Sequence, residues 1–286
     1  MTSDPFVRFA AGNPLTVLIR GGGDLGTGVA HRLHRAGLYV VVSELPQPLV
    51  VRRTVAFASA MYEGQITVER VKARLAGDKP EIERLLAQGI VPVIADPIGE
   101  AITRLQPDVV VDARMAKRNL GTTLADAPIV IGLGPGFTAG QDVHAVVETM
   151  RGHNLGRVIL QGSAEPDTRV PGLLQGYGQE RVLRAPRAGL FRSHMRIAER
   201  VEAGQTVAYV TDQPVQASIS GVLRGLLHDN LLVHQEQKVG DIDPSGIVEH
   251  CFTISDKARA VGGGVLEAIL YLSRPSVPGP NPCRSI

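Results

Sequence analysis

A glycine-rich loop near the start of the chain has the spacing of a phosphate-binding turn. An apolar run at residues 17–19 leads into Gly21-x-Gly23-x-x-Gly26, with Asp24 inside the loop. Gly21 permits a tight turn, Gly23 lets backbone N–H groups approach a phosphate, and Gly26 lets a helix pack closely on a sheet. The following helix would offer unpaired N–H groups and its positive dipole end to an anion. We therefore predict that Gly21, Gly23, Asp24 and Gly26 bind a cofactor; the alternative is that the glycines only make a turn.

An acidic residue lies downstream at the distance that dinucleotide sites require. Leu25, Val29 and Leu33 recur with helical spacing, and a second apolar run then ends at Glu44. In a strand–turn–helix–strand unit, an acid roughly twenty residues past the glycines accepts hydrogen bonds from ribose hydroxyls. The pattern predicts a dinucleotide as a ligand, with Glu44 among the binding residues. The alternative is a solvated Glu44 at the end of a strand.

Polar residues and glycines also follow the other predicted strands. Ligands of a doubly wound sheet bind outside the carboxyl ends of its strands, so we expect these residues to share one crevice. The basic residues among them suit a polyanionic ligand, although such a cluster can also be the solvated start of a helix. The set is Arg20, Asp96, Asp112, Arg114, Lys117, Arg118, Asn119, Gly134 and Gly136.

Residues 142–153 carry Asp142-x-His144-x3-Glu148-x4-His153. A helix predicted at about 140–151 would place His144 and Glu148 one turn apart, and imidazole with carboxylate suits zinc. Neither the spacing nor the ligand number is diagnostic, so we predict no metal, with His144, Glu148 and His153 as the candidates if one is bound. Asp112 and His144 are the candidates for a catalytic residue, and His144 is the one that a dehydrogenase could use for proton transfer.

Strands and helices alternate up to residue 161, which predicts a parallel sheet covered on both faces. The expected fold class is α/β, a Rossmann-like doubly wound, mostly parallel sheet formed by residues 15–180 plus 251–273. Within the last segment, the glycines at 262–264 would interrupt a helix unless close packing against another backbone, or a nearby ligand, rewards them.

Residues 181–250 have a different texture, with short β-rich runs separated by glycine. Residues 185–189 match residues 217–221, which indicates an internal duplication. The region resembles the barrel-sandwich hybrid of lipoyl and biotinyl carrier domains, and we expect it to be an inserted β module. Its central hairpin at 210–214 has no lysine to carry a prosthetic group, which argues against a swinging-arm carrier. Residues 274–286 are expected to be a disordered tail.

Composition limits the classes of partner. The chain has 286 residues, a net charge of +2, 4% aromatic residues and no tryptophan, which argues against nucleic acid. No apolar run is long enough for a membrane span, and no signal peptide is recognisable. The two cysteines, Cys251 and Cys283, do not form a disulfide framework, which fits a cytoplasmic protein. Homo-oligomerisation is left open.

Several longer stretches resemble one protein family. They lie at residues 20–33, 44–48, 116–122, 131–159 and 253–260. Over about residues 15–272 the chain is similar to the YqeB family, which is named for the selenium-dependent molybdenum hydroxylase system. That family is reminiscent of the accessory factors of xanthine dehydrogenase, which have a Rossmann-like part and assist the molybdopterin cofactor.

The resemblance implies an accessory or maturation protein for a molybdenum hydroxylase, with that enzyme or its cofactor machinery as the partner. A molybdopterin-type cofactor with a nucleotide part would suit the first glycine loop, Glu44 and the basic cluster. Two alternatives are an NAD(P)-dependent oxidoreductase and a non-catalytic scaffold protein. Whether the chain is an enzyme is left open.

Overall fold

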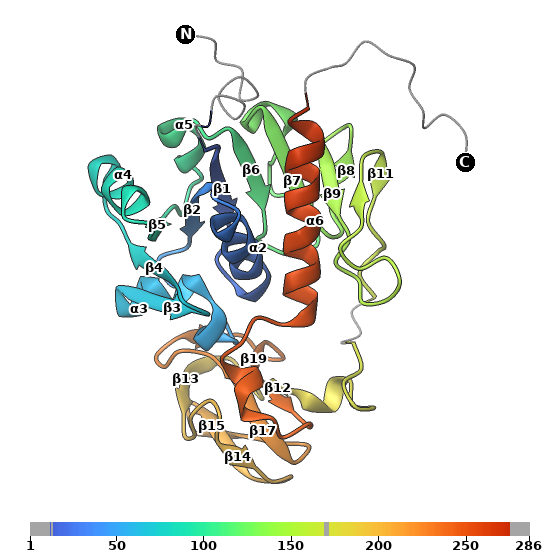
Figure 1. Ribbon diagram of the computed structural model, residues 1–286. Helices are drawn as coiled ribbons and strands as arrows, with labels where there is room; N and C mark the ends of the chain where they lie inside the picture. Colours follow the sequence, from blue (N-terminus) through green and yellow to red (C-terminus); the bar gives the residue numbers. More distant parts are fainter. Residues whose placement is uncertain (1–11, 13, 169–171, 275–286) are drawn as a thin grey trace.

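The computed structural model of the chain describes residues 12, 14–168 and 172–274. Of the expected disordered tail, only Arg274 lies within the described residues. The chain forms two parts in succession, each built around its own β-sheets. The last helix packs against the first part (Figure 1).

The first part is built on a nine-stranded sheet with the order β10-β9-β7-β6-β1-β2-β5-β4-β3. The seven inner strands are parallel, whereas β3 and β10 run antiparallel at the two edges. The central strands are almost completely buried because both faces of the sheet are covered. Their bounds are β1 (Thr16–Arg20), β2 (Tyr39–Glu44), β3 (Gln65–Val68), β4 (Val71–Leu75), β5 (Val91–Ala95), β6 (Val109–Asp112), β7 (Ile129–Leu133), β9 (Ala145–Val147) and β10 (Val158–Ile159). A separate pair joins β8 (Thr138–Ala139) and β11 (Gly162–Ser163).

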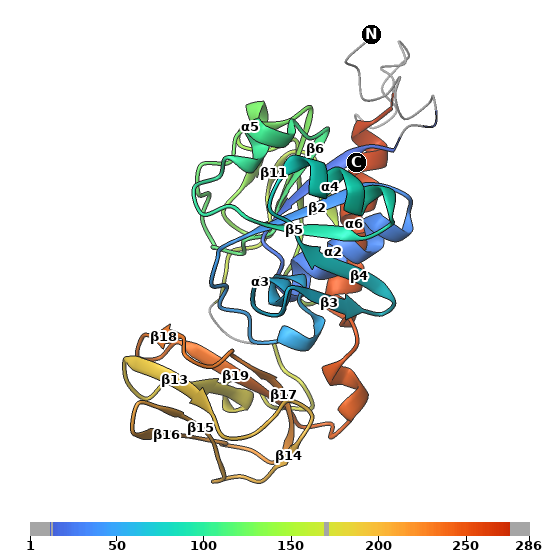
Figure 2. The same ribbon diagram turned by 90° about the vertical axis from the view of Figure 1, so that its left-hand side faces the viewer.

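Two helices, α2 (Asp24–Arg35) and α6 (Asp256–Leu272), lie side by side on one face of this sheet (Figure 1). The other face packs against α4 (Lys79–Ala87) and α5 (Ala101–Leu105), and the short α3 (Ala60–Glu63) lies near β3 (Figure 2). Helix α6 runs unbroken through its three glycines. An added Cβ at Gly262 would lie 2.9 Å from the Gly28 carbonyl oxygen, and at Gly264 2.2 Å from that of Gly156. Close backbone packing therefore offsets the cost of glycine in this helix.

The second part, which we call the β-rich region, spans residues 182–243 and has its own apolar core. Two four-stranded antiparallel sheets form it, in the orders β12-β19-β17-β14 and β16-β15-β13-β18. The strands are β12 (Val182–Arg184), β13 (Gly189–Ser193), β14 (Arg200–Val201), β15 (Thr206–Val210), β16 (Gln213–Gln216), β17 (Gly221–Leu226), β18 (Leu232–Val233) and β19 (Lys238–Asp243).

A segment of the first part at residues 48–54, which we call the wall segment, contacts the β-rich region. The Leu226 N–H donates a 2.8 Å hydrogen bond to the Val51 carbonyl, and an added Cβ at Gly225 would lie 2.7 Å from Val51 Cγ1. Arg52 donates to Asp24 Oδ2 at 2.9 Å and to the carbonyls of His250 and Thr253 at 2.9 and 3.0 Å. Arg52 thus ties the glycine loop to the chain that leads from the β-rich region into α6.

The expected fold class is corrected by this topology. The nine-stranded sheet is mixed rather than doubly wound: residues 113–128 and 134–144, all of them described, contain no α-helix between β6, β7 and β9. Helix α6 packs against β7, β9 and β10, but it comes from the end of the chain and does not connect two of these strands. The β-rich region consists of two separate antiparallel sheets and is not assigned to the barrel-sandwich hybrid class.

The helix predicted at 140–151 is also wrong. Residues 145–147 form β9, because Ala145, Val146 and Val147 are all buried in the sheet. Among the described residues, no helix combines the length and the apolar composition that a membrane span requires.

Candidate functional site

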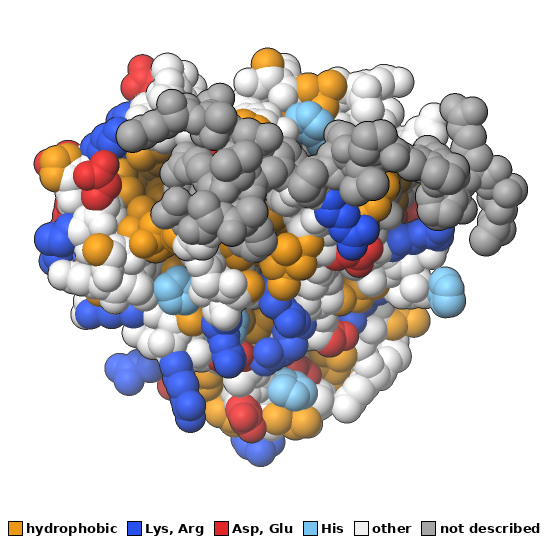
Figure 3. Space-filling view, turned by 45° about the horizontal axis from the view of Figure 1, so that its top comes forward, with side chains coloured by type: hydrophobic (Ala, Val, Ile, Leu, Met, Phe, Trp, Pro, Cys, Tyr) orange, Lys and Arg blue, Asp and Glu red, His pale blue; other side chains and the backbone are white. Residues whose placement is uncertain are grey.

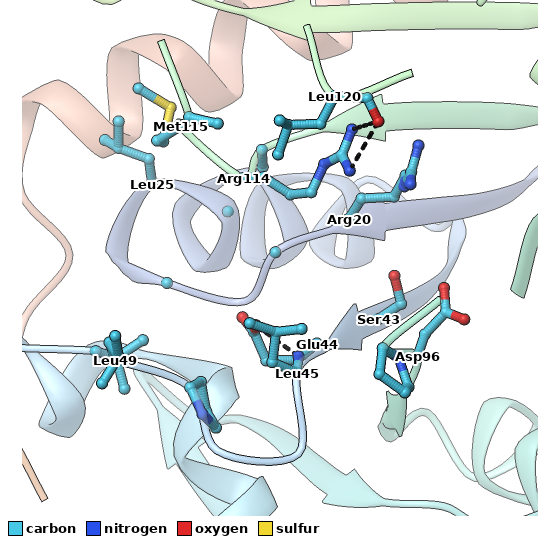
Figure 4. A pocket seen from close by; sticks show the side chains of 18 of the residues that line it. Arg20, Leu25, Ser43, Glu44, Leu45, Leu49, Asp96, Arg114, Met115 and Leu120 are labelled. Carbon is cyan, nitrogen blue, oxygen red and sulfur yellow. Dashed lines mark hydrogen bonds between the residues drawn. The ribbon is translucent and has the colours of Figure 1, made fainter. Parts of the chain in front are cut away.

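A cavity of about 760 Å³ lies at the carboxyl edge of β1, β2, β5 and β6 (Figure 4). It is bounded by the glycine loop, the end of β2, the wall segment and the turns after β5 and β6. The predicted residues Gly21, Gly23, Asp24, Gly26 and Glu44 therefore meet here with Arg20, Asp96 and Arg114. The full lining is Arg20, Gly21, Gly23, Asp24, Leu25, Gly26, Ser43, Glu44, Leu45, Pro48, Leu49, Val50, Asp96, Pro97, Ile98, Gly99, Ala113, Arg114, Met115, Ala116 and Leu120.

The three motif glycines have different roles. Gly21 has a φ of +102°, which favours glycine, and an added Cβ at Gly26 would lie 2.0 Å from the Gly21 carbonyl oxygen. At Gly23, by contrast, an added Cβ would meet only Val50 Cγ1 at 3.9 Å. Gly21 and Gly26 are thus required by the loop itself, whereas the space at Gly23 is left open to the cavity.

The N-terminus of α2 faces this open space. Gly23 is its N-cap and has no side-chain cap, and the first backbone bond of the helix runs from the Thr27 N–H to the Gly23 carbonyl at 2.7 Å. The N–H groups of the first turn are therefore available to an anion in the cavity.

Glu44 is held at the cavity by backbone groups rather than by a cation. Its Oε2 accepts a 2.8 Å hydrogen bond from the Gly22 N–H, and its Oε1 accepts one of 2.8 Å from the Leu45 N–H. Burial raises the pKa of this carboxyl, and the two hydrogen bonds partly oppose the shift. Within the described residues Glu44 has no ion pair, so its remaining lone pairs can accept hydrogen bonds from a ligand.

Two arginines line the opposite side of the cavity and share one buried carboxylate (Figure 4). Asp112, only 2% exposed, accepts from Arg114 Nε at 3.1 and 3.2 Å and from Thr122 Oγ1 at 2.7 Å. Arg20 Nη1 donates to the same hydroxyl at 2.9 Å and lies 3.8 Å from Asp126. Burial alone would raise the pKa of Asp112, but the hydrogen bonds from Arg114 and Thr122 outweigh it and lower the pKa. Burial and the neighbouring Arg114 lower the pKa of Arg20.

The rim of the cavity is apolar. Ile98 is 77% exposed and Leu49 51%, and Leu45 and Leu120 are also exposed. Exposed apolar side chains around a polar centre are typical of a binding site that also contacts an apolar part of its ligand. The spacing motifs did not predict these residues, although the Glu44-Leu-Pro-Gln-Pro sequence at the end of β2 marks where they begin.

Five residues predicted to bind the cofactor lie outside the cavity lining. Lys117 pairs with Asp167 at 3.4 Å, and Asn119 exchanges hydrogen bonds with the Thr122 backbone at 2.8 and 2.7 Å. Gly136 packs on the Arg118 backbone, where an added Cβ would lie 2.7 Å from its Cα, and Gly134 packs on Thr149. Gly134 and Gly136 thus serve local packing, and Asn119 stabilises the turn that carries Thr122.

The candidate metal ligands are not brought together. His144 Nδ1 accepts a 3.0 Å hydrogen bond from the Val130 N–H, and burial lowers the pKa of the ring. Glu148 is buried and accepts from the backbone N–H groups of Thr149, Met150 and Glu165. His153 is exposed, and the described residues contain no group of three or more His, Cys, Asp or Glu side chains that could hold a metal ion. His144 also lies outside the cavity, while Asp112 is engaged by Arg114 and Thr122.

Comparison with solved structures found distant likenesses. One is an aspartoacylase family protein from Mesorhizobium loti, 13% identical, covering 80% of this chain and 85% of that chain with a TM-score of 0.26. Another is a succinylglutamate desuccinylase/aspartoacylase from Rhodobacter sphaeroides, 15% identical with the same coverage and a TM-score of 0.25. At these TM-scores the two proteins assign neither a fold nor an activity to this chain.

The expected role as an accessory protein of a molybdenum hydroxylase finds no support in these comparisons, since neither structure is named as one. That role and its nucleotide or molybdopterin ligand are not proposed further, and neither are the oxidoreductase and scaffold alternatives.

No protein-family model matches the chain. A curated relative, the uncharacterized protein YqeB of Escherichia coli (strain K12), is 48% identical over 261 residues, which is 91% of this chain. The chain spans about half the length of that relative, 48% of it. This similarity supports the YqeB family assignment that the sequence motifs suggested.

Proposed function

We propose that the protein binds a small hydroxylated metabolite that carries an anionic group, in the cavity at the carboxyl edge of β1, β2, β5 and β6. The observation that carries the proposal is the pairing of Glu44, a carboxylate without an ion pair among the described residues, with the uncapped N-terminus of α2 at Gly23. Glu44 accepts hydrogen bonds from hydroxyl groups, and the N–H groups at the start of α2 donate hydrogen bonds to an anion.

The arrangement separates these two functions in space. The anion lies against Gly23, because only there is the loop free of side chains and close backbone contacts. The hydroxyl groups lie at Glu44, whose orientation is fixed by the Gly22 and Leu45 N–H groups. The glycine loop holds both Glu44 and the N-terminus of α2, so the distance between the two binding positions is fixed. The site is therefore preorganised for a ligand of one length.

The arginine pair adds charge without occupying the anion position. Arg20 and Arg114 already bond to Thr122 and Asp112, so they act mainly through their field and through donors that remain free at the cavity surface. The exposed Leu49 and Ile98 then cover the less polar part of the ligand.

Calorimetric titration tests the proposal with two probes, ribose 5-phosphate and gluconate, which join hydroxyl groups to a phosphate and to a carboxylate. We expect at least one of them to bind, and ribose or inorganic phosphate alone to bind more weakly. In Glu44→Gln the affinity should fall roughly 10-fold or more, since hydrogen bonds to a charged group contribute about 1.5–3 kcal/mol.

Glu267→Gln is the matched control, because Glu267 is exposed on α6 and lies outside the cavity. Its affinity for the probe should equal that of the wild type. Failure of both probes to bind at millimolar concentration, or equal binding by Glu44→Gln, would overturn the proposal.

A further inference from the structure

A second cavity, of about 390 Å³, lies in the groove between α2 and α6. Three arginines and a histidine line it, Arg32, Arg35, Arg259 and His31, above an apolar floor that includes Ile254 and Leu266. No carboxylate of the described residues belongs to this lining. Figure 3 shows Lys and Arg side chains, with His side chains among them, on the face turned to the viewer.

The acid next to the groove is already engaged. Glu69 Oε1 accepts a 2.6 Å hydrogen bond from Arg259 Nη2 and one of 2.8 Å from the Ile254 N–H, and Glu69 Oε2 lies 4.0 Å from His31 Nε2. Glu69 therefore offsets the charge of Arg259 and lies near His31, and no contact joins it to Arg32 or Arg35 among the described residues. The groove keeps a surplus of positive charge.

Arg32 and Arg35 lie in the last turn of α2, where their charges complement the helix dipole, and their guanidinium groups are free to contact a ligand. Neither makes an ion pair or a side-chain hydrogen bond with any described residue, and both are exposed. Their side chains do not cap α2: the N–H groups of Ala36, Gly37 and Leu38 bond to the carbonyls of Arg32, Leu33 and His34.

The walls of the groove are fixed. An added Cβ at Gly28 would lie 2.7 Å from Ala258 Cβ, and one at Gly262 would lie 2.9 Å from the Gly28 carbonyl oxygen, so the two helices cross with their backbones in close contact. Two of these charges also act on His31: burial lowers the pKa of its ring, and Arg35 and Arg259 lower it further, against the opposing effect of Glu69.

We propose that this groove binds a small multivalent anion, with Arg32, Arg35 and Arg259 as its ligands. Guanidinium groups bind phosphate and carboxylate oxygens in pairs, so several of them around one cavity select a ligand with several charges. The site lies toward the C-terminal end of α2, whereas the first cavity lies at its N-terminal end. Arg32 and Arg35 lie about 9–14 Å along the helix axis from Gly26, the last residue of α2 in the lining of the first cavity.

The test is a calorimetric titration with inorganic tripolyphosphate and, separately, with citrate, which distinguishes a phosphate ligand from a tricarboxylate. We expect one of them to bind with a stoichiometry of one. The double variant Arg32→Ala/Arg35→Ala should lose at least 10-fold in affinity, and it keeps the Arg32 Cβ that packs against Gly262.

Arg104→Ala/Arg192→Ala is the matched control, since it removes the same charge from two exposed arginines outside the groove. Its affinity should stay within about twofold of the wild type after correction for ionic strength. Equal losses in the two double variants would show diffuse attraction and overturn the site, as would the absence of binding by either anion. Gly23→Val, which blocks the first cavity, should leave this binding unchanged, so that failure of one site is separable from failure of the other.

Discussion

The Gly22 N–H lies 2.8 Å from Oε2 of Glu44 and joins the glycine loop after β1 to the end of β2. Only glycine fits at position 22, because an added Cβ there would lie 2.8 Å from Val42 Cγ1 and 2.9 Å from the Ala58 nitrogen. The position of the acid and the shape of the loop are therefore one structural feature. The spacing motif treats Gly22 as a variable position, but the structure requires a glycine there.

Gly23 and Gly26 should respond in opposite ways to a side chain. Gly23→Val should lose at most about 1 kcal/mol, as expected for a poorer N-cap residue, because the new side chain enters open space. It should abolish binding of the probe that the first cavity accepts. Gly26→Ala should lose stability first, since its Cβ would lie 2.0 Å from the Gly21 carbonyl oxygen. Thermal melts and calorimetry on the two variants check this. Probe binding by Gly23→Val with unchanged affinity would mean that the glycine serves only the turn.

Removal of the charge at Asp112 should strongly destabilise the protein. Asp112→Asn leaves Arg114 without its buried counter-charge, while Arg20 keeps Asp126 at 3.8 Å, and breaking a buried pair typically costs about 3–5 kcal/mol. Asp212→Asn is the control, because the Arg187–Asp212 pair is exposed and should contribute less than about 1 kcal/mol. Urea unfolding measures both. Comparable losses in the two variants would contradict the role given to the buried network.

Acid should weaken the contact between the β-rich region and α3 through His228. Its ring stacks on Tyr62 with centroids 4.0 Å apart, and Arg53 Nη1 lies 3.4 Å from its Nδ1. Burial, and then Arg53, lower the pKa of His228 from 6.5 to about 4 despite the opposing charge of Asp229. Between these two pH values the unfolded chain binds a proton that the folded chain does not, so stability falls as the pH falls through this window, by at most about 3 kcal/mol.

The variant His228→Phe keeps a ring against Tyr62 and removes the titration. Urea unfolding between pH 7 and pH 4.5 should show that the free energy of unfolding falls more steeply toward acid in the wild type than in His228→Phe. Contributions of the other groups are common to both proteins and cancel in the difference. Parallel curves would show that His228 does not titrate as stated.

The glycines of α6 offer a paired test of helix packing. An added Cβ at Gly263 meets nothing within 4 Å, so Gly263→Ala should stabilise the protein by roughly 0.5–1 kcal/mol through helix propensity alone. Gly264→Ala should destabilise it by about 1–3 kcal/mol, because its Cβ would lie 2.2 Å from the Gly156 carbonyl oxygen. Urea unfolding at neutral pH separates the two signs. Stabilisation by both variants would mean that α6 can move away from residue 156.

The sequence predicted the parts of the site that depend on local spacing. The strand before Gly21, the helix after it and the placement of Glu44 all follow from short-range patterns, and the structure brings Gly21, Gly23, Gly26 and Glu44 to one cavity. The rest depends on tertiary contacts. Lys117 is drawn to Asp167, and residues 145–147 form a strand because burial on both faces overrides their helical spacing. The exposed leucines of the rim carry no periodic signal at all.

The groove between α2 and α6 cannot be recognised in the sequence for a related reason. Arg32 and Arg35 look like the polar side of an amphipathic helix, and Arg259 lies far away along the chain. Only the return of α6 to the sheet places it beside them. Charges that converge through chain topology cannot be read from spacing.

The wall segment makes the first cavity and the β-rich region mechanically dependent on one another. Leu49 and Val50 line the cavity, while the next residue, Val51, bonds to Leu226 and packs on Gly225, and Arg52 reaches Asp24 at the start of α2. A displacement of the β-rich region therefore also moves the cavity wall. Coupling between two binding events is reciprocal. If docking of the β-rich region favours binding of a molecule in the cavity, that molecule favours docking by the same free energy.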